Sequence, residues 1–138
     1  MKKKIRQLVR YLPALIWMAL IFYGSSQQRI KVADQFWLNF LFFKTLHVLE
    51  YGILFLLWCL ALGDNKSYST KLAAALTIFY GITDELHQTL VPTREGRLRD
   101  VLIDALGVLI FWRFVLNKFL LSSKKLLLLF KAGGAKKE

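Results

Sequence analysis

The sequence has little cysteine and little acidic charge. Cys59 is the single cysteine, so a disulfide framework and a Cys-x-x-Cys metal or redox motif are both excluded. Nine acidic residues stand against 20 lysines and arginines, which gives a formal charge of +11. A clear small-x-small cleavage site is also lacking after the first apolar run. We therefore expect that run to remain in the protein as an uncleaved helix.

Apolar side chains are abundant instead. They make up 56% of the 138 residues, which is more than a soluble domain of this size needs. Four segments are apolar and long enough to cross a bilayer, which takes about 20 helical residues at roughly 1.5 Å each. The sequence therefore predicts an all-α integral membrane protein with four antiparallel transmembrane helices. We expect the spans near Tyr11–Tyr23, Lys44–Leu62, Thr70–Val91 and Asp100–Leu121.

Two segments do not fit a transmembrane span. Phe36–Phe43 is rich in aromatic residues but too short to cross the bilayer, so we expect a short interfacial segment there. Residues 1–121 would then form the four-helix domain. Residues 122–138 would form a basic cytoplasmic tail, amphipathic or disordered.

The distribution of basic residues predicts the orientation and the partner. Lys and Arg collect at the cytoplasmic ends of spans, and here they concentrate in the amino end, in the turn near Lys66 and in the tail. We therefore expect a multi-pass protein with both termini in the cytoplasm. Because the basic residues lie at segment ends and not along one soluble face, they favour anionic lipid over nucleic acid as the partner.

Polar side chains gather at the outer ends of the predicted spans. Lys44, His47 and Tyr51 recur at helical spacing and share one stripe, with Glu50 beside them. The later spans and the loop between them supply Asp84, Glu85, His87, Gln88, Arg94, Arg99, Asp100 and Asp104, and the first span contributes Ser26. A charge at the bilayer centre costs about 2.5–3.5 kcal/mol. We therefore expect these groups to be shallow, paired or protonated around one outward-opening pocket.

Two other interpretations of the cluster stay open. The charges can simply neutralise one another and hold the helices together. A metal site is also conceivable, because His47-x-x-Glu50 and Asp84-x-x-His87 superficially resemble the ligand pairs of dinuclear carboxylate bundles. Such bundles need further carboxylates from the other helices, and the first span offers none. We therefore predict neither a metal nor a cofactor.

The polar residues, taken in order, resemble the pattern of a known family. The motifs are Ser25-Ser26-Gln27, Lys44-x-x-His47-x-x-x-Tyr51-x-x-Leu54, Tyr80-Gly81-x-x-Asp84-Glu85-x-His87-Gln88-x-x-x-Pro92-x-Arg94 and Asp100-x-x-x-Asp104-x-x-Gly107. In order and spacing they resemble the VanZ-like membrane proteins of bacteria. The chain departs from the family pattern at Gln28 and Thr93, where the family often has proline and glycine.

The resemblance implies a role in the bacterial cell envelope, in the cytoplasmic membrane. The namesake of the family is associated with resistance to the glycopeptide antibiotic teicoplanin, so the resemblance implies a link between this chain and that resistance. It also supports the choice of site residues, and it does not by itself imply an enzyme.

Our first functional hypothesis is a binding or remodelling protein. Its pocket would take an anionic lipid or a lipid-linked envelope precursor, with Arg94 and Arg99 on phosphate oxygens, because the planar donor fork of arginine suits them.

The second hypothesis is a membrane-embedded hydrolase or transferase acting on such a lipid. Glu85 or Asp84 would be the general base and His47 its proton partner. A serine nucleophile, Ser25 or Ser26, with a histidine base is also conceivable, although nothing local favours it. A lipid transporter is a third hypothesis, which the apolar inner half of the spans disfavours.

Overall fold

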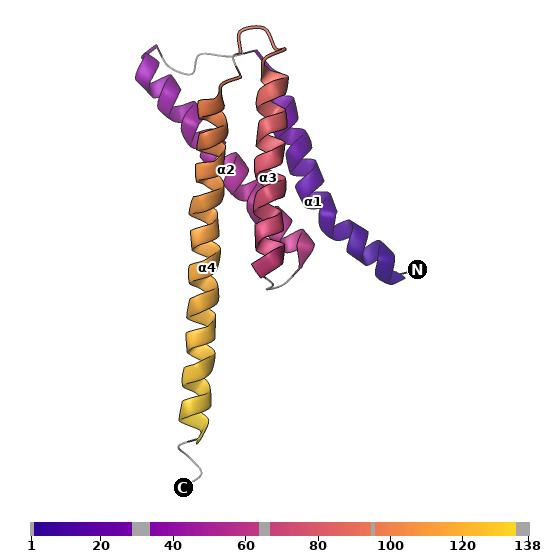
Figure 1. Cartoon of the computed structure of the whole chain (residues 1–138), viewed down its shortest axis with the longest axis vertical. Coiled ribbons are helices and arrows are strands. Elements are labelled where there is room, and N and C mark those ends of the chain that lie inside the picture. The colour runs from indigo at the N-terminus through magenta and orange to yellow at the C-terminus, as the bar shows by residue number, and fades with distance from the viewer. Residues whose placement is uncertain (1, 29–33, 64–66, 95, 135–138) are drawn as a thin grey trace.

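The computed structural model describes residues 2–28, 34–63, 67–94 and 96–134, which contain four α-helices and no strand (Figure 1). The helices are α1 (Lys2–Ser25), α2 (Phe36–Leu62), α3 (Ser67–Gln88) and α4 (Leu98–Gly134). The predicted all-α fold class is therefore confirmed over the described part of the chain.

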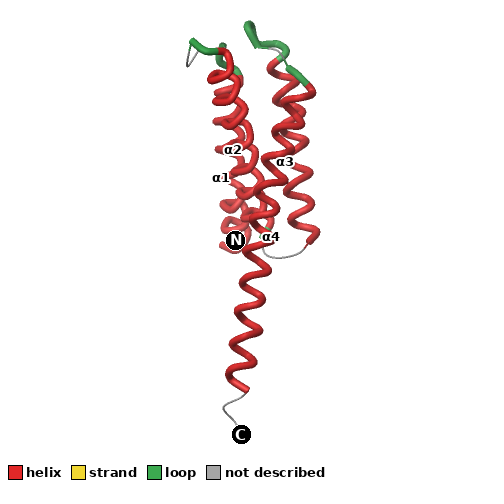
Figure 2. Tube along the Cα trace, turned by 90° about the vertical axis from the view of Figure 1, so that its left-hand side faces the viewer, coloured by secondary structure: helices red, strands yellow, loops and turns green. Residues whose placement is uncertain are grey.

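The central helix is α2, since it packs against each of the other three. It crosses the bundle obliquely, whereas α3 lies against α4 on one side and α1 on the other (Figure 1). The described residues that directly follow α1 and α3 lie at one end of the bundle, and the amino end of α1 and the carboxyl end of α4 lie toward the other (Figure 2). The helices thus alternate in direction, and one end of the bundle, called the loop end below, collects the carboxyl ends of α1 and α3.

Two apolar clusters hold the helices together. The first consists of Ala14 and Ile21 of α1 with Tyr51 and Leu54 of α2. The second consists of Phe55 of α2, Ala73 and Ala74 of α3, and Val108 of α4. Small alanine side chains at such contacts let helix backbones approach one another closely.

The prediction of a separate interfacial segment before the second helix is wrong. Phe36–Phe43 forms the first turns of α2, which runs without interruption from Phe36 to Leu62. No glycine or proline lies in or just after this segment, so nothing stops the helical hydrogen bonding before Lys44. The aromatic residues therefore extend the second helix instead of preceding it.

Two other helix ends differ from the prediction. α3 ends at Gln88 and not at Val91, because residues 89–91 form a turn in which the Leu90 and Val91 amides donate to the His87 and Gln88 carbonyls. α4 continues past Leu121 to Gly134, so residues 122–134 are a helical extension of the fourth helix (Figure 1). The last residues of the predicted tail, 135–138, lie outside the described residues.

Among the described residues, α2 is the one helix that is long and apolar enough to cross a membrane, and Val9–Ser25 of α1 is a shorter apolar stretch. The outward sides of the other helices are also apolar. Leu20, Phe79 and Phe114, from α1, α3 and α4, are 55%, 67% and 62% exposed. Monomeric soluble proteins rarely expose large contiguous apolar patches, so this surface is unusual for a soluble monomer.

Candidate functional site

An open pocket of about 720 Å³ lies at the loop end of the bundle. The apolar part of its wall is made by Ile21, Phe43 and Leu46. The other lining residues come from the end of α1 and the residues that follow it: Gly24, Ser25, Ser26, Gln27 and Gln28. Further lining residues are His47 and Glu50 of α2, Asp84 and Gln88 of α3, and Arg94 of the loop after α3. The pocket therefore joins an apolar wall to a dense set of hydrogen-bonding groups.

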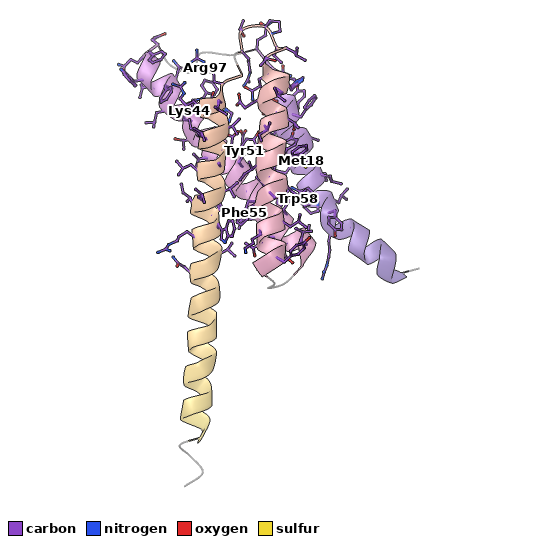
Figure 3. All side chains as sticks on the ribbon, viewed as in Figure 1. Met18, Lys44, Tyr51, Phe55, Trp58 and Arg97 are labelled. Carbon is purple, nitrogen blue, oxygen red and sulfur yellow. The ribbon has the colours of Figure 1, made fainter. Side chains whose placement is uncertain are left out.

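Asp84 is the residue on which three helices converge. Its Oδ1 accepts a hydrogen bond from Ser25 Oγ at 2.6 Å, and its Oδ2 accepts from Tyr51 OH at 3.1 Å and from Gln88 Nε2 at 2.9 Å. Tyr51 lies between the helices, some way below the loop end (Figure 3). Because both oxygens already accept hydrogen bonds, Asp84 acts here as an acceptor that fixes α1 and α2 against α3.

Arg94 ties the loop after α3 to the end of α1. Its Nε donates to the Gln27 carbonyl and its Nη2 to the Gly24 carbonyl, both at 2.8 Å, and its Nη1 lies 3.5 Å from Gln88 Oε1. The last carbonyls of a helix have no partner within the helix. A guanidinium at this position satisfies two carbonyls and places its charge at the negative end of the helix dipole. Arg94 therefore shapes the pocket and brings positive charge to its wall.

A second polar cluster links α2 to α4. Lys44 Nζ lies 2.7 Å from Asp100 Oδ1, and His47 Nδ1 lies 2.9 Å from Asp104 Oδ1. Arg99 reaches the same Asp100 oxygen at 3.6 Å, but its side chain is 53% exposed. Lys44 lies near the loop end in the ribbon view (Figure 3). These two buried pairs hold the first turns of α4 against the first half of α2.

His47 belongs to both clusters, because it also lines the pocket. The Asp104 carboxylate accepts from Nδ1, so in the neutral ring Nδ1 carries the proton and Nε2 keeps its lone pair. Within the described part of the chain, Nε2 has no hydrogen-bond partner. The His47 ring is therefore oriented by Asp104 and can accept a proton on the side away from it.

Glu85 lies apart from the pocket and is buried. Its Oε2 accepts a hydrogen bond from the Arg97 amide at 3.0 Å, which fixes the loop before α4. Its Oε1 has no hydrogen-bond partner among the described residues. Glu85 therefore stabilises the loop, and it does not touch the space in which a ligand would lie.

Ser26 and His87 form the serine–histidine pair that the structure brings together. Ser26 Oγ lies 3.0 Å from His87 Nε2, while the hydroxyl donates to the Phe22 carbonyl at 2.6 Å. Because the hydroxyl proton points to that carbonyl, His87 donates to the serine oxygen and does not withdraw its proton. This geometry is that of a helix–helix contact and not of an activated nucleophile.

The structure divides the predicted site residues into two groups. Six line the pocket: Ser26, His47, Glu50, Asp84, Gln88 and Arg94. Tyr51 and His87 touch that group through Asp84 and Ser26. The remaining five lie outside the lining, on α2, α3 and the first turns of α4: Lys44, Glu85, Arg99, Asp100 and Asp104.

The sequence analysis chose Ser26 for the pocket and considered Ser25 only as a nucleophile, whereas Ser25 is the serine that contacts Asp84. The spacing of residues along α1 indicates that Ser25 faces a neighbouring helix. Ala14, Ile21 and Ser25 fall on one helical stripe, and the first two are buried in the contact with α2. The serine that continues the buried stripe is the one that reaches the neighbouring helix.

A known protein family matches the part of the chain that contains these residues. The family model described as VanZ/LLP1 matches residues 10–121, which include both polar clusters. No curated protein and no solved structure was found to match the chain. Because the match covers well over half of the 138 residues and α2 is apolar enough to cross a bilayer, the chain belongs to the VanZ/LLP1 family and is a VanZ-related membrane protein of the cell envelope.

Proposed function

We propose that the protein spans the bacterial cytoplasmic membrane four times and that its pocket binds the headgroup of an anionic lipid or of a lipid-linked envelope precursor. The observation that supports this most is the composition of the pocket, in which an apolar wall adjoins Arg94 and several other hydrogen-bonding groups. A lipid headgroup with its first acyl carbons has the same division between polar and apolar parts.

The proposed topology rests on the exposed surface and on charge. Each helix turns apolar side chains outward, and the buried polar groups of α3 and α4 face the other helices. Membrane helices with polar interiors have this arrangement. Because basic residues concentrate at the termini, we place both termini in the cytoplasm and the loop end outside. The pocket then opens at the outer headgroup level.

The pocket lining favours a phosphate next to hydroxyl groups. Arg94 and Gln88 offer N–H donors for phosphate oxygens, and the guanidinium supplies charge. Glu50, on the same wall, is an acceptor and suits the hydroxyls of a glycerol or sugar headgroup. Arg99 is not part of this proposal, because it lies against Asp100 and over the Phe40 ring, away from the lining residues.

A second function, a hydrolase or transferase acting on such a lipid, is favoured by the His47–Asp104 pair. A histidine whose Nδ1 is held by a carboxylate can remove a proton with Nε2, and His47 lines the pocket. His47 is thus a better candidate base than Asp84, whose oxygens are occupied, or Glu85, which lies outside the lining. A family link to teicoplanin resistance is part of the proposal for either function.

Three measurements test the proposal. Native mass spectrometry of the purified protein should show more bound phosphatidylglycerol than phosphatidylcholine at equal concentration, and equal binding of both would contradict it. Thin-layer chromatography of the same lipids after incubation with the protein separates the two functions, because a new product shows an enzyme. A host expressing the protein should need more teicoplanin for growth inhibition than the same host expressing an Arg94→Gln variant.

A further inference from the structure

Three helices each contribute one side chain to a compact group beside the pocket, and of the three only His47 also lines the pocket. The residues are His47 of α2, Glu85 of α3 and Asp104 of α4. Each offers one ligand atom, a ring nitrogen or a carboxylate oxygen, and these atoms all lie within 4.8 Å of one another. Glu85 and Asp104 are 4% and 1% exposed, so the group is shielded from solvent on the acidic side.

Two oxygens of this group have no hydrogen-bond partner. They are Glu85 Oε1 and Asp104 Oδ2, both fully buried among the described residues. Buried carboxylate oxygens in folded proteins are almost always satisfied by a donor, a water molecule or a cation. Here two carboxylates and one histidine approach one another, and Lys44 is paired with Asp100. The group therefore contains no lysine or arginine, and His47 supplies positive charge only when it is protonated.

We propose that His47, Glu85 and Asp104 bind one divalent transition-metal ion, zinc or manganese. One imidazole nitrogen and two carboxylate oxygens form a donor set that suits these ions and leaves positions open for water or substrate. The imidazole binds a metal only through an unprotonated nitrogen, so an ion on the Asp104 side would replace the Nδ1 proton, which is released to solvent. Zinc takes such ligands at about 2.0–2.2 Å, so two ligand atoms of one ion lie roughly 3–4 Å apart. The group closes onto an ion through side-chain movements of about 1 Å or less.

This ligand set differs from both pairs that the sequence pattern offered. Asp84 is occupied by its three hydrogen bonds, and His87 contacts Ser26. The three ligands proposed here come from three helices, so no local spacing in the sequence connects them. The sequence analysis therefore weighed only the two local pairs, and it predicted no metal because the first span offers no further carboxylate.

The inference goes beyond the proposed lipid binding, although the two sites share His47. An ion held there adds positive charge beside the pocket, which suits a phosphate. Metal binding can nevertheless be measured without any lipid. Wild-type protein that binds no metal but still prefers the anionic lipid would overturn the metal site and leave the proposed lipid binding intact.

The test uses tag-free protein purified in detergent, stripped with a chelator and dialysed against Zn²⁺, Mn²⁺ or Co²⁺. Bound metal is counted by inductively coupled plasma mass spectrometry, and the visible spectrum of the Co²⁺ form reports coordination by nitrogen and oxygen. We expect about one ion per chain, bound at least about tenfold more weakly after Asp104→Asn or Glu85→Gln. Glu50→Gln is the matched control, because Glu50 is a nearby acid outside the group, and it should retain the ion.

A second readout covers the case in which Asp104→Asn does not fold. Glu85→Gln keeps a carbonyl oxygen that can accept from the Arg97 amide, so this variant should remain folded. Added Zn²⁺ should raise the melting temperature of the wild type and of Glu50→Gln, and it should leave that of Glu85→Gln unchanged. Wild-type protein that takes up no stoichiometric ion, or Glu85→Gln protein that binds as the wild type does, would overturn the proposal.

Discussion

Ser25 and Asp84 are separated by 59 positions in the chain, yet Ser25 Oγ donates a hydrogen bond to Asp84 Oδ1 at 2.6 Å. The bond joins the end of α1 to the last turns of α3, where both helices border the pocket. It is one of three bonds to the same carboxylate, so the geometry of the pocket depends on a single buried acid.

We expect Asp84→Asn to destabilise the protein. The amide keeps one oxygen to accept from Tyr51 and Gln88 but loses the charge, and Ser25 can accept from the new N–H only by turning its hydroxyl to the Phe22 carbonyl. Hydrogen bonds to charged groups contribute about 1.5–3 kcal/mol and neutral ones about 0.5–1.5 kcal/mol, so we expect a loss of about 1 kcal/mol per bond. The free energy of unfolding in detergent, from denaturant titration, measures this loss. Asp34→Asn, at an exposed position, should leave it unchanged; equal stability of both variants would show that Asp84 is not held as described.

The buried pair of Lys44 and Asp100 gives a second test of stability. Lys44→Met leaves Asp100 beside an exposed arginine only, and removing one partner of a buried ion pair costs about 3–5 kcal/mol. The double variant Lys44→Met with Asp100→Leu should recover much of this loss, because no buried charge is then left unpaired. The same denaturant titration applies, with Lys71→Met at an exposed position as the control. Additive losses in the double variant would argue against the pair.

Gly107 should not tolerate a side chain. A Cβ at this position would overlap the Val48 carbonyl oxygen, so Gly107→Ala pushes α4 away from α2. We expect a loss of about 1–3 kcal/mol in the free energy of unfolding. Gly24→Ala is the matched control, because nothing lies within 4 Å of its Cβ and alanine favours a helix over glycine by up to about 1 kcal/mol. A stable Gly107→Ala variant would mean that the two helices are further apart.

The proposed topology can be tested by labelling in whole cells. In a Cys59→Ser background, Thr93→Cys at the loop end should react with a membrane-impermeant maleimide added outside. Tyr68→Cys, near the start of α3 and 72% exposed, should react only after the cells are broken. The reverse pattern would place the loop end and the pocket in the cytoplasm.

The helices could be predicted from the sequence because apolar runs and helical spacing are local properties. The start of α2 and the end of α4 were predicted wrongly because the prediction relied on the length of a membrane span. No residue in Phe36–Phe43, or in residues 122–134 before Gly133, breaks a helix, so both helices continue through these segments. Spacing also placed the polar residues on the correct turns. Helical spacing could not show which neighbouring helix each face of a helix contacts. The two polar clusters on either side of His47 were therefore predicted as a single cavity.

Binding of lipid in the pocket is tested most directly by the affinity of Gly24→Phe for phosphatidylglycerol. Gly24 lines the pocket and an added Cβ would meet nothing within 4 Å, so we expect the helix contacts to be kept and the phenyl ring to take up space in the cavity. We predict that phosphatidylglycerol binding, measured by native mass spectrometry, weakens by more than about tenfold, or about 1.4 kcal/mol, at an unchanged melting temperature. Thr83→Phe, which adds the same ring at an exposed position outside the pocket, should bind as the wild type does. Wild-type affinity in Gly24→Phe would contradict the proposal that the headgroup lies in this pocket.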